Sequence, residues 1–255
     1  MIIFVYDHTF EGLLTALFDA YVRRTFPDKL LHETEPLPLF YNELYRVTTC
    51  TEKAERVWKA LCRKLSKQAT ALITYCWLSE SSEAPMLLMK YMKQIFDSKH
   101  SITTDFTNPV TLAVTQLGRK VSGERHRILQ FIRFQKLADG TYFGIIEPLY
   151  NVLSLTIRHF QDRFADQHWI IYDARRHFGY YYDGIQVNEI AFTNVHQPAL
   201  LTGKVDENLL DREERLYQTL WKNYFHSICI RERLNPVKHK KDMPVRYWKF
   251  LTEKN

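Results

Sequence analysis

Apolar residues recur at intervals of three and four through most of the first half of the chain. This spacing is typical of helices that bury one face, and the short apolar run Ile2–Tyr6 before them predicts a strand. Residues 1–121 are therefore expected to form an N-terminal strand and a helical region. The predicted segments are the strand at 2–6, a helix over 10–21, an extended proline-containing connection at 26–46, a helix from the Thr49/Glu52 capping box that continues or restarts through Cys76, and helices over 86–96 and 109–121.

The pattern changes after residue 121, where β-branched and aromatic residues form short runs. Ile128–Leu137 and Tyr142–Glu147 flank Asp139-Gly140, a dipeptide that favours a tight hairpin turn. Further strands are predicted at 169–173, 178–182 and 185–192, and helices at 153–164 and 206–228. We therefore expect an α+β fold, with an antiparallel sheet and packed helices in residues 122–255. The regions 1–121 and 122–255 can be two domains or one continuous domain.

Composition and cysteine spacing exclude several classes of protein. Of the 255 residues, 45% are hydrophobic and 25% are charged, which is typical of a globular protein. No apolar stretch approaches the roughly 18 residues of a membrane span, so no membrane partner is expected. The four cysteines are widely spaced, and the first residues lack the basic region of a secretory signal. These features indicate a cytoplasmic protein with reduced thiols.

The sequence holds no recognisable metal or cofactor motif. It has no glycine-rich phosphate loop of the GxxxxGK[ST] or GxGxxG kind and no GxSxG nucleophile motif. It also lacks a CxxxCxxC cluster and any histidine or cysteine spacing typical of a zinc site. We therefore expect no bound metal and no cofactor in this chain.

Positive charge is concentrated in two segments of the chain. The formal net charge is +6. A first basic run over residues 119–136 carries Arg119, Lys120, Arg125, Arg127, Arg133 and Lys136 against Glu124 alone, and residues 229–255 carry eight basic and three acidic side chains. Clustered cations attract polyanions such as DNA, although a solvated face and a frayed tail are the alternative interpretation. Apolar residues interleaved in the tail indicate that it packs against something. The candidate DNA-binding residues are Arg119, Lys120, Arg125, Arg127, Arg133, Arg163, Asn235, Lys238, Lys240, Lys241, Arg246 and Trp248.

Two polar groups are candidates for catalysis. Glu124 and His126 lie in the segment SGERHR, directly before a predicted strand, where they could act as a base and its orienting partner while Arg127 holds a phosphate. His159 and Arg163 lie four residues apart on one face of a predicted helix. A salt-bridge cluster at a helix end and an ordinary surface pair are the alternative interpretations.

Several motifs in order along the chain resemble one protein family. They are FVYDHTFEGLL at 4–14, VSGERHR at 121–127, FIRF at 131–134, HFQDRF at 159–164, DQHWIIYD at 166–173, LWKNYF at 220–225, Asn235-Pro236 and MPVRYW at 243–248. Through them the chain resembles the bacterial family called domain of unknown function 4130, whose members are often labelled probable DNA metabolism protein. The family typically has arginine and phenylalanine where this chain has Lys238 and Leu234.

The resemblance implies work on DNA beside an enzyme partner. Members tend to be encoded next to a radical-SAM protein thought to repair or modify DNA, and related domains occur fused to uracil-DNA-glycosylase-like domains. Three hypotheses follow: a DNA-binding accessory subunit of the radical-SAM enzyme, which we favour; a metal-independent enzyme acting on DNA through Glu124 with His126 or His159; and a structural partner of the radical-SAM protein that does not touch DNA.

Overall fold

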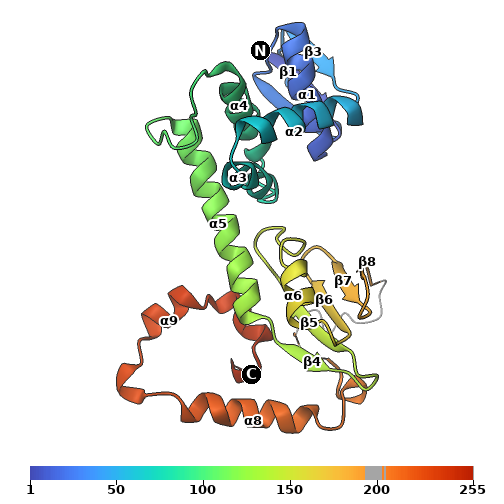
Figure 1. Cartoon of the computed structure of the whole chain (residues 1–255), viewed down its shortest axis with the longest axis vertical. Helices are drawn as coiled ribbons and strands as arrows, with labels where there is room; N and C mark the ends of the chain where they lie inside the picture. Colours follow the sequence, from blue (N-terminus) through green and yellow to red (C-terminus); the bar gives the residue numbers. More distant parts are fainter. Residues whose placement is uncertain (193–202, 204, 255) are drawn as a thin grey trace. The chain divides into compact units, whose positions relative to one another are not determined.

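The computed structural model describes residues 1–192, 203 and 205–254, and its contacts divide the chain into two units (Figure 1). The first unit is Met1–Ser122 and the second is Gly123–Asn255. The boundary lies beside the change of pattern expected at residue 121, and the independence of the two units as domains stays a prediction. No helix in the described part of the chain is both long enough and apolar enough to cross a membrane.

A parallel sheet of three strands, in the order β2-β1-β3, organises the first unit. β1 (Ile2–Tyr6) was predicted, whereas β2 (Lys29–His32) and β3 (Glu43–Arg46) lie where the sequence predicted an extended connection. Each of these short strands is stabilised by hydrogen bonds to a partner far away in the sequence, so the local pattern alone gives little sign of it.

Helices pack against this sheet and bury the apolar stripes seen in the sequence. The predicted helix from Thr49 to Cys76 is two helices, because Ser66 caps a new one by accepting a hydrogen bond from the backbone N–H of Ala69. The predicted capping box is wrong: Cys50 is the N-cap residue, and Thr49 bonds to Asp7 instead. The helices are α1 (Phe10–Arg23), α2 (Thr51–Lys64), α3 (Lys67–Trp77) and α4 (Ala84–Asp97).

The turn from β1 to α1 is held by the carboxylate of Asp7. Its Oδ1 accepts hydrogen bonds from the Thr9 backbone N–H at 3.0 Å and from the Thr9 hydroxyl at 2.8 Å, and its Oδ2 accepts one from the Thr49 hydroxyl at 2.8 Å. Although partial burial alone would raise it, the pKa of Asp7 is lowered by these hydrogen bonds. A Cβ on Gly12 would lie only 2.1 Å from Oδ1, so the glycine leaves room for this carboxylate.

α5 (Pro109–Phe131) is longer than the sequence predicted. The run beginning at Ile128 was expected to be a strand, but Val121, Glu124 and Ile128 are all buried at spacings of three and four. That spacing places them on one face of a helix, which outweighs the strand preference of the β-branched residues. The SGERHR segment therefore lies within a helix and not directly before a strand.

The second unit contains a mixed sheet of five strands in the order β4-β5-β6-β7-β8, which confirms the α+β class. The expectation that this sheet is antiparallel needs one correction: β5 and β6 are parallel, because the chain crosses over through α6 (Ile157–Arg163) between them. Gly140 and Gly184 have φ values of 87° in the two predicted Asp-Gly turns. The strands are β4 (Phe134–Lys136), β5 (Tyr142–Ile146), β6 (Trp169–Asp173), β7 (Phe178–Tyr182) and β8 (Val187–Ile190).

The C-terminal segment folds back onto this unit. The helix predicted over 206–228 begins later than expected, as α8 (Glu214–Ser227), because residues 207–209 form a short 3-10 helix and Leu210 pairs with Leu137 beside the edge of β4. Tyr247 and Phe250 are buried, so the tail packs as its apolar residues predicted. The other elements are α9 (Pro236–Asp242) and the short 3-10 helices η1 (Glu207–Leu209), η2 (Arg231–Arg233), η3 (Val245–Phe250) and η4 (Thr252–Lys254).

Candidate nucleic-acid interface

The side chain of Glu124, only 1% exposed, anchors the C-terminal segment to α5. Its Oε1 accepts a hydrogen bond from the Leu149 backbone N–H at 2.8 Å, and its Oε2 accepts one from Arg246 at 2.5 Å and one from Arg127 at 3.4 Å. Burial alone would raise the pKa of Glu124, but the Leu149 N–H and the Arg246 guanidinium lower it below its usual value. Glu124 is therefore an ionised, hydrogen-bonded carboxylate that fixes η3.

A second buried carboxylate, Glu253, connects three elements. Arg133 binds both of its oxygens, at 3.2 and 2.6 Å, and the indole N–H of Trp221 donates to it at 2.8 Å. The Arg133 guanidinium also lies 5.5 Å from the centre of a Trp221 ring. Although burial alone would raise the pKa of Glu253, the hydrogen bonds from Arg133 and Trp221 lower it. These contacts hold α8 beside the start of β4.

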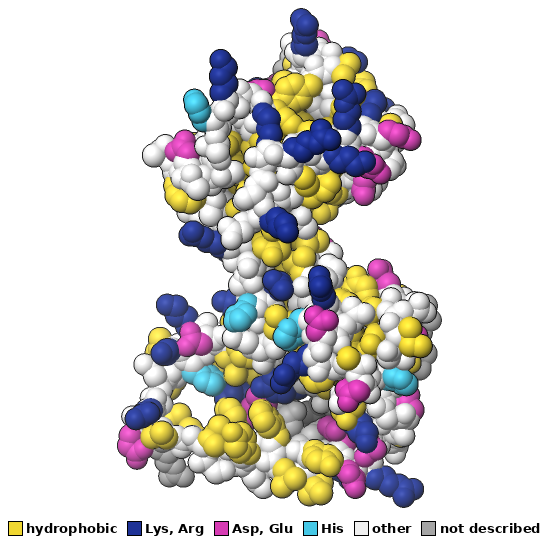
Figure 2. Space-filling model, viewed as in Figure 1, with side chains coloured by type: hydrophobic (Ala, Val, Ile, Leu, Met, Phe, Trp, Pro, Cys, Tyr) yellow, Lys and Arg dark blue, Asp and Glu magenta, His cyan; other side chains and the backbone are white. Residues whose placement is uncertain are grey.

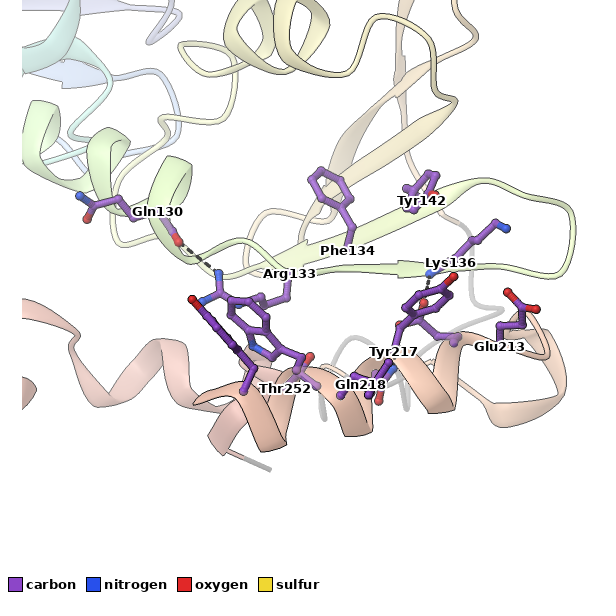
Figure 3. A pocket seen from close by; sticks show the side chains of 13 residues that line it. Gln130, Arg133, Phe134, Lys136, Tyr142, Glu213, Tyr217, Gln218 and Thr252 are labelled. Carbon is purple, nitrogen blue, oxygen red and sulfur yellow. Dashed lines mark hydrogen bonds between the residues drawn. The ribbon is translucent and has the colours of Figure 1, made fainter. Parts of the chain in front are cut away.

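A pocket of about 880 Å³ lies between α8 and the β4–β5 hairpin. In Figure 3, Tyr217 rises from α8 towards the hairpin, from which Phe134 and Tyr142 project. A bond from the backbone N–H of Lys136 to the Glu214 carboxylate, at 3.1 Å, ties the helix to the strand edge. The lining residues are Gln130, Arg133, Phe134, Lys136, Tyr142, Glu213, Glu214, Tyr217, Gln218, Leu220, Trp221, Tyr224 and Thr252.

Aromatic side chains are unusually accessible along α8. Tyr217 is 57% exposed, Tyr224 is 55% exposed and Trp221 is 39% exposed. Figure 2 shows hydrophobic side chains gathered over α8 at the lower edge of the view. Flat aromatic faces next to a pocket can stack on nucleic-acid bases, and tyrosine and tryptophan add polar edges for hydrogen bonds.

The two cations in the pocket wall are already paired with carboxylates. Arg133 binds Glu253, and the ammonium of Lys136 lies 3.5 Å from Asp211. Glu213 and Glu214 add negative charge to the wall. The pocket is therefore suited to stacking and hydrogen bonding with bases more than to gripping phosphates.

The candidate catalytic residues do not converge in the described part of the chain. Glu124 is buried and engaged, whereas His126 and His159 are exposed, His126 beside Gln130 at 3.0 Å and His159 against the ring of Phe160. Among the described residues no contact joins Glu124, His126 and His159. Their catalytic role stays a prediction, which this geometry does not support.

The basic residues predicted from the sequence fall into two groups. Arg127, Arg133 and Arg246 join the first basic run to the tail, but through ion pairs with buried carboxylates. At these three positions the positive charge is balanced by a buried carboxylate, and the part that these residues play in DNA binding stays a prediction. Of the basic residues predicted from the sequence, those that are exposed and for which the described residues provide no carboxylate partner are Arg119 and Lys120 in the first unit and Arg163, Lys238, Lys240 and Lys241 in the second.

Three other predicted DNA ligands make structural contacts. Arg125 donates to the Leu155 carbonyl at 3.1 Å. Asn235 caps α9 by accepting from the Lys238 backbone N–H at 3.0 Å. The indole of Trp248 donates to the Met243 carbonyl at 3.0 Å and is only partly exposed. Their part in DNA binding stays a prediction.

Sequence reasoning missed Tyr142, Tyr217 and Tyr224 as site residues. Trp221 and Tyr224 lie in the LWKNYF motif, so the family resemblance could have indicated them as site residues. Leu220 and Tyr224 recur at helical spacing in the sequence, which is typical of a buried face, and Tyr217 lies on the same apolar stripe of α8. The stripe is exposed, because α8 rests on the sheet edge through a few polar contacts.

The fold and pocket define an α+β protein with an aromatic site on its second unit. Among the residues that the structure describes, no three histidine, cysteine, aspartate or glutamate side chains are grouped so as to hold a metal ion. The chain belongs to the family described as domain of unknown function (DUF4130), whose model matches residues 82–253. No curated protein and no solved structure matches the chain.

Proposed function

We propose that this protein is a DNA-binding accessory subunit that works with a radical-SAM enzyme in DNA repair or modification. In this proposal the protein holds the DNA while its partner carries out the chemistry. The observation that carries the binding role is the row of exposed aromatic side chains on α8 beside the pocket. The choice of DNA and of the partner comes from the family resemblance, whereas the cytoplasmic location that we propose rests on the cysteine usage and on the first residues, which lack the basic region of a secretory signal.

Bases would stack on Tyr217, Trp221 and Tyr224, while unpaired lysines supply contacts to phosphates. Exposed cations on α9, Lys238 among them, belong to the same unit as the pocket. Stacking is tolerant of sequence because every base has an aromatic face, and cation contacts make binding dependent on salt. The proposal therefore expects DNA binding with little sequence preference that weakens as salt rises.

Replacing Tyr217 and Tyr224 together by alanine is expected to weaken DNA binding about 30-fold or more, because each stacked base contributes about 1–3 kcal/mol. Both side chains are more than half exposed, so the fold should survive the change. The measurement is the affinity of a fluorescent single-stranded oligonucleotide at low salt.

The matched control is Phe106→Ala, which removes an aromatic ring that is 49% exposed in the first unit. We expect this variant to bind DNA like the wild type. Equal affinity of the double tyrosine variant and the wild type would exclude the α8 pocket as the binding site, and no measurable DNA binding by the wild type at low salt would exclude the DNA-binding role.

A further inference from the structure

A second hollow in the Gly123–Asn255 unit is lined mainly by cations. It measures about 390 Å³ and is formed by Glu147, Leu149, Arg175, Val245, Arg246 and Lys249. The basic side chains of Arg175, Arg246 and Lys249 come from two separate parts of the chain and surround one space. Glu147 is the single carboxylate among the residues that line it. Arg175 belongs to neither of the basic segments noted in the sequence.

The folding of the chain fixes Arg175 and Arg246 at this hollow. Arg175 lies in the turn after β6, where the buried carboxylate of Asp173 accepts a bond from its backbone N–H at 2.9 Å. Its guanidinium donates to the Leu149 carbonyl at 3.1 Å. The guanidinium of Arg246 donates a hydrogen bond to the buried carboxylate of Glu124 at 2.5 Å. Both guanidiniums are therefore oriented before any ligand arrives.

Each of these guanidiniums keeps donors for a ligand. A guanidinium carries five N–H groups in a planar fork. The hydrogen bond to Leu149 uses one N–H of Arg175 and the bond to Glu124 uses one of Arg246, whose guanidinium also lies 4.8 Å from the centre of the Tyr247 ring. Lys249 adds a third positive charge, although Glu147 lies against it. Two forked donors and a lysine around a small hollow match the oxygens of a phosphate group.

We propose that Arg175, Arg246 and Lys249 form a phosphate-binding site. The phosphate group that binds there is either a backbone phosphate or the 5′-terminal phosphate of a DNA strand. This part of the inference rests on the proposed function. The site is distinct in its residues from the aromatic pocket on α8, so the two would contact different parts of the same strand.

Replacing Arg175 by glutamine is expected to weaken binding of a short single-stranded oligonucleotide about tenfold, because one charge-assisted contact to phosphate is lost. The slope of log affinity against log salt should fall by about 0.7. Arg158→Gln, at an exposed arginine of α6, is the matched control and should change affinity less than about twofold. Oligonucleotides with a 5′-phosphate and with a 5′-hydroxyl are compared: a loss confined to the first identifies the terminal phosphate, and an equal loss in both identifies the backbone.

Titration of the wild-type chain with inorganic phosphate provides an independent readout. We expect saturable changes in the guanidinium NMR signals of Arg175 and Arg246, and none in that of Arg158. If the Arg175→Gln variant binds DNA like the wild type and inorganic phosphate leaves both signals unchanged, the phosphate site is overturned while the proposed function stands. If the wild type binds inorganic phosphate at these arginines but binds no DNA, the proposed function is overturned and the phosphate site stands.

Discussion

Replacing Glu124 by alanine is expected to destabilise the Gly123–Asn255 unit by about 1–3 kcal/mol, because it removes the hydrogen bonds to Arg246 and leaves the Leu149 backbone N–H without its acceptor. The side chain is 1% exposed and holds Arg246 and the Leu149 backbone N–H. Without it, η3 loses its anchor on α5. The measurement is the free energy of unfolding in urea, with hydrogen exchange to show that the loss falls on the second unit.

The pH dependence of stability gives the same prediction a second readout. Because the pKa of Glu124 is lower in the folded chain than its ordinary value of 4.5, the unfolded chain binds more protons in acid. The stabilisation from Glu124 is therefore present above pH 4.5 and is lost as pH falls towards the folded pKa. Glu124→Ala should flatten this part of the profile.

Glu232→Ala removes an exposed glutamate from the same unit and serves as the control, with an expected change of less than about 0.5 kcal/mol. A Glu124→Ala variant as stable as this control, with an unchanged acid profile, would show that the carboxylate does not anchor η3. That result would favour the hypothesis that Glu124 is a catalytic residue.

Replacing Gly12 by alanine is expected to destabilise the Met1–Ser122 unit by about 3 kcal/mol. The new Cβ would lie 2.1 Å from Asp7 Oδ1 and 3.0 Å from the Thr49 hydroxyl. The Asp7 carboxylate cannot move aside without losing its bonds to Thr9 and Thr49, so overpacking and lost hydrogen bonds add together. Urea unfolding followed by hydrogen exchange in the first unit measures the effect.

Gly123 provides the matched control for this change. It also lies in a helix, α5, but a Cβ there meets no atom within 4 Å. Gly123→Ala is therefore expected to stabilise the chain by about 0.5–1 kcal/mol through helix propensity. If both alanine variants have the same small effect, the close fit of Asp7 against Gly12 is not a feature of the protein in solution.

Local signals in the sequence predicted the elements that local interactions determine. The stripe at Leu13 and Leu17 predicted α1, and the Asp-Gly turns ending at Gly140 and Gly184 predicted the two hairpins. In these cases a few neighbouring residues supply the burial pattern or the turn conformation, so the interpretation did not depend on the rest of the fold.

Elements that depend on distant partners were harder to predict. β2 and β3 are short, and each is formed by parallel pairing with β1. The parallel pairing of β5 with β6 likewise depends on the crossover through α6. The end of α5 was missed because the β-branched Ile128 favours a strand in isolation but is helical here through the face that it buries.

In the candidate site, too, the sequence indicates the type of residue, whereas the contacts of that residue depend on the fold. Charge counting identified Arg133 and Arg246, but only the fold reveals that buried Glu253 and Glu124 already bind them. Conversely, helical spacing predicted α8 with a start that was too early, and it did not reveal that the aromatic side chains of this helix are exposed. A sequence pattern predicts that a face is apolar, but it does not say what covers that face.

Photo-crosslinking tests most directly whether DNA is held at α8. A single strand carrying photoreactive uracil is bound to the wild-type chain, irradiated, and the crosslinked peptides are identified by mass spectrometry. We predict crosslinks to Tyr217, Trp221 or Tyr224, which vanish when both tyrosines are replaced by alanine and the tryptophan by leucine. Crosslinks confined to residues 1–122, under conditions where the chain binds the strand, would contradict the account.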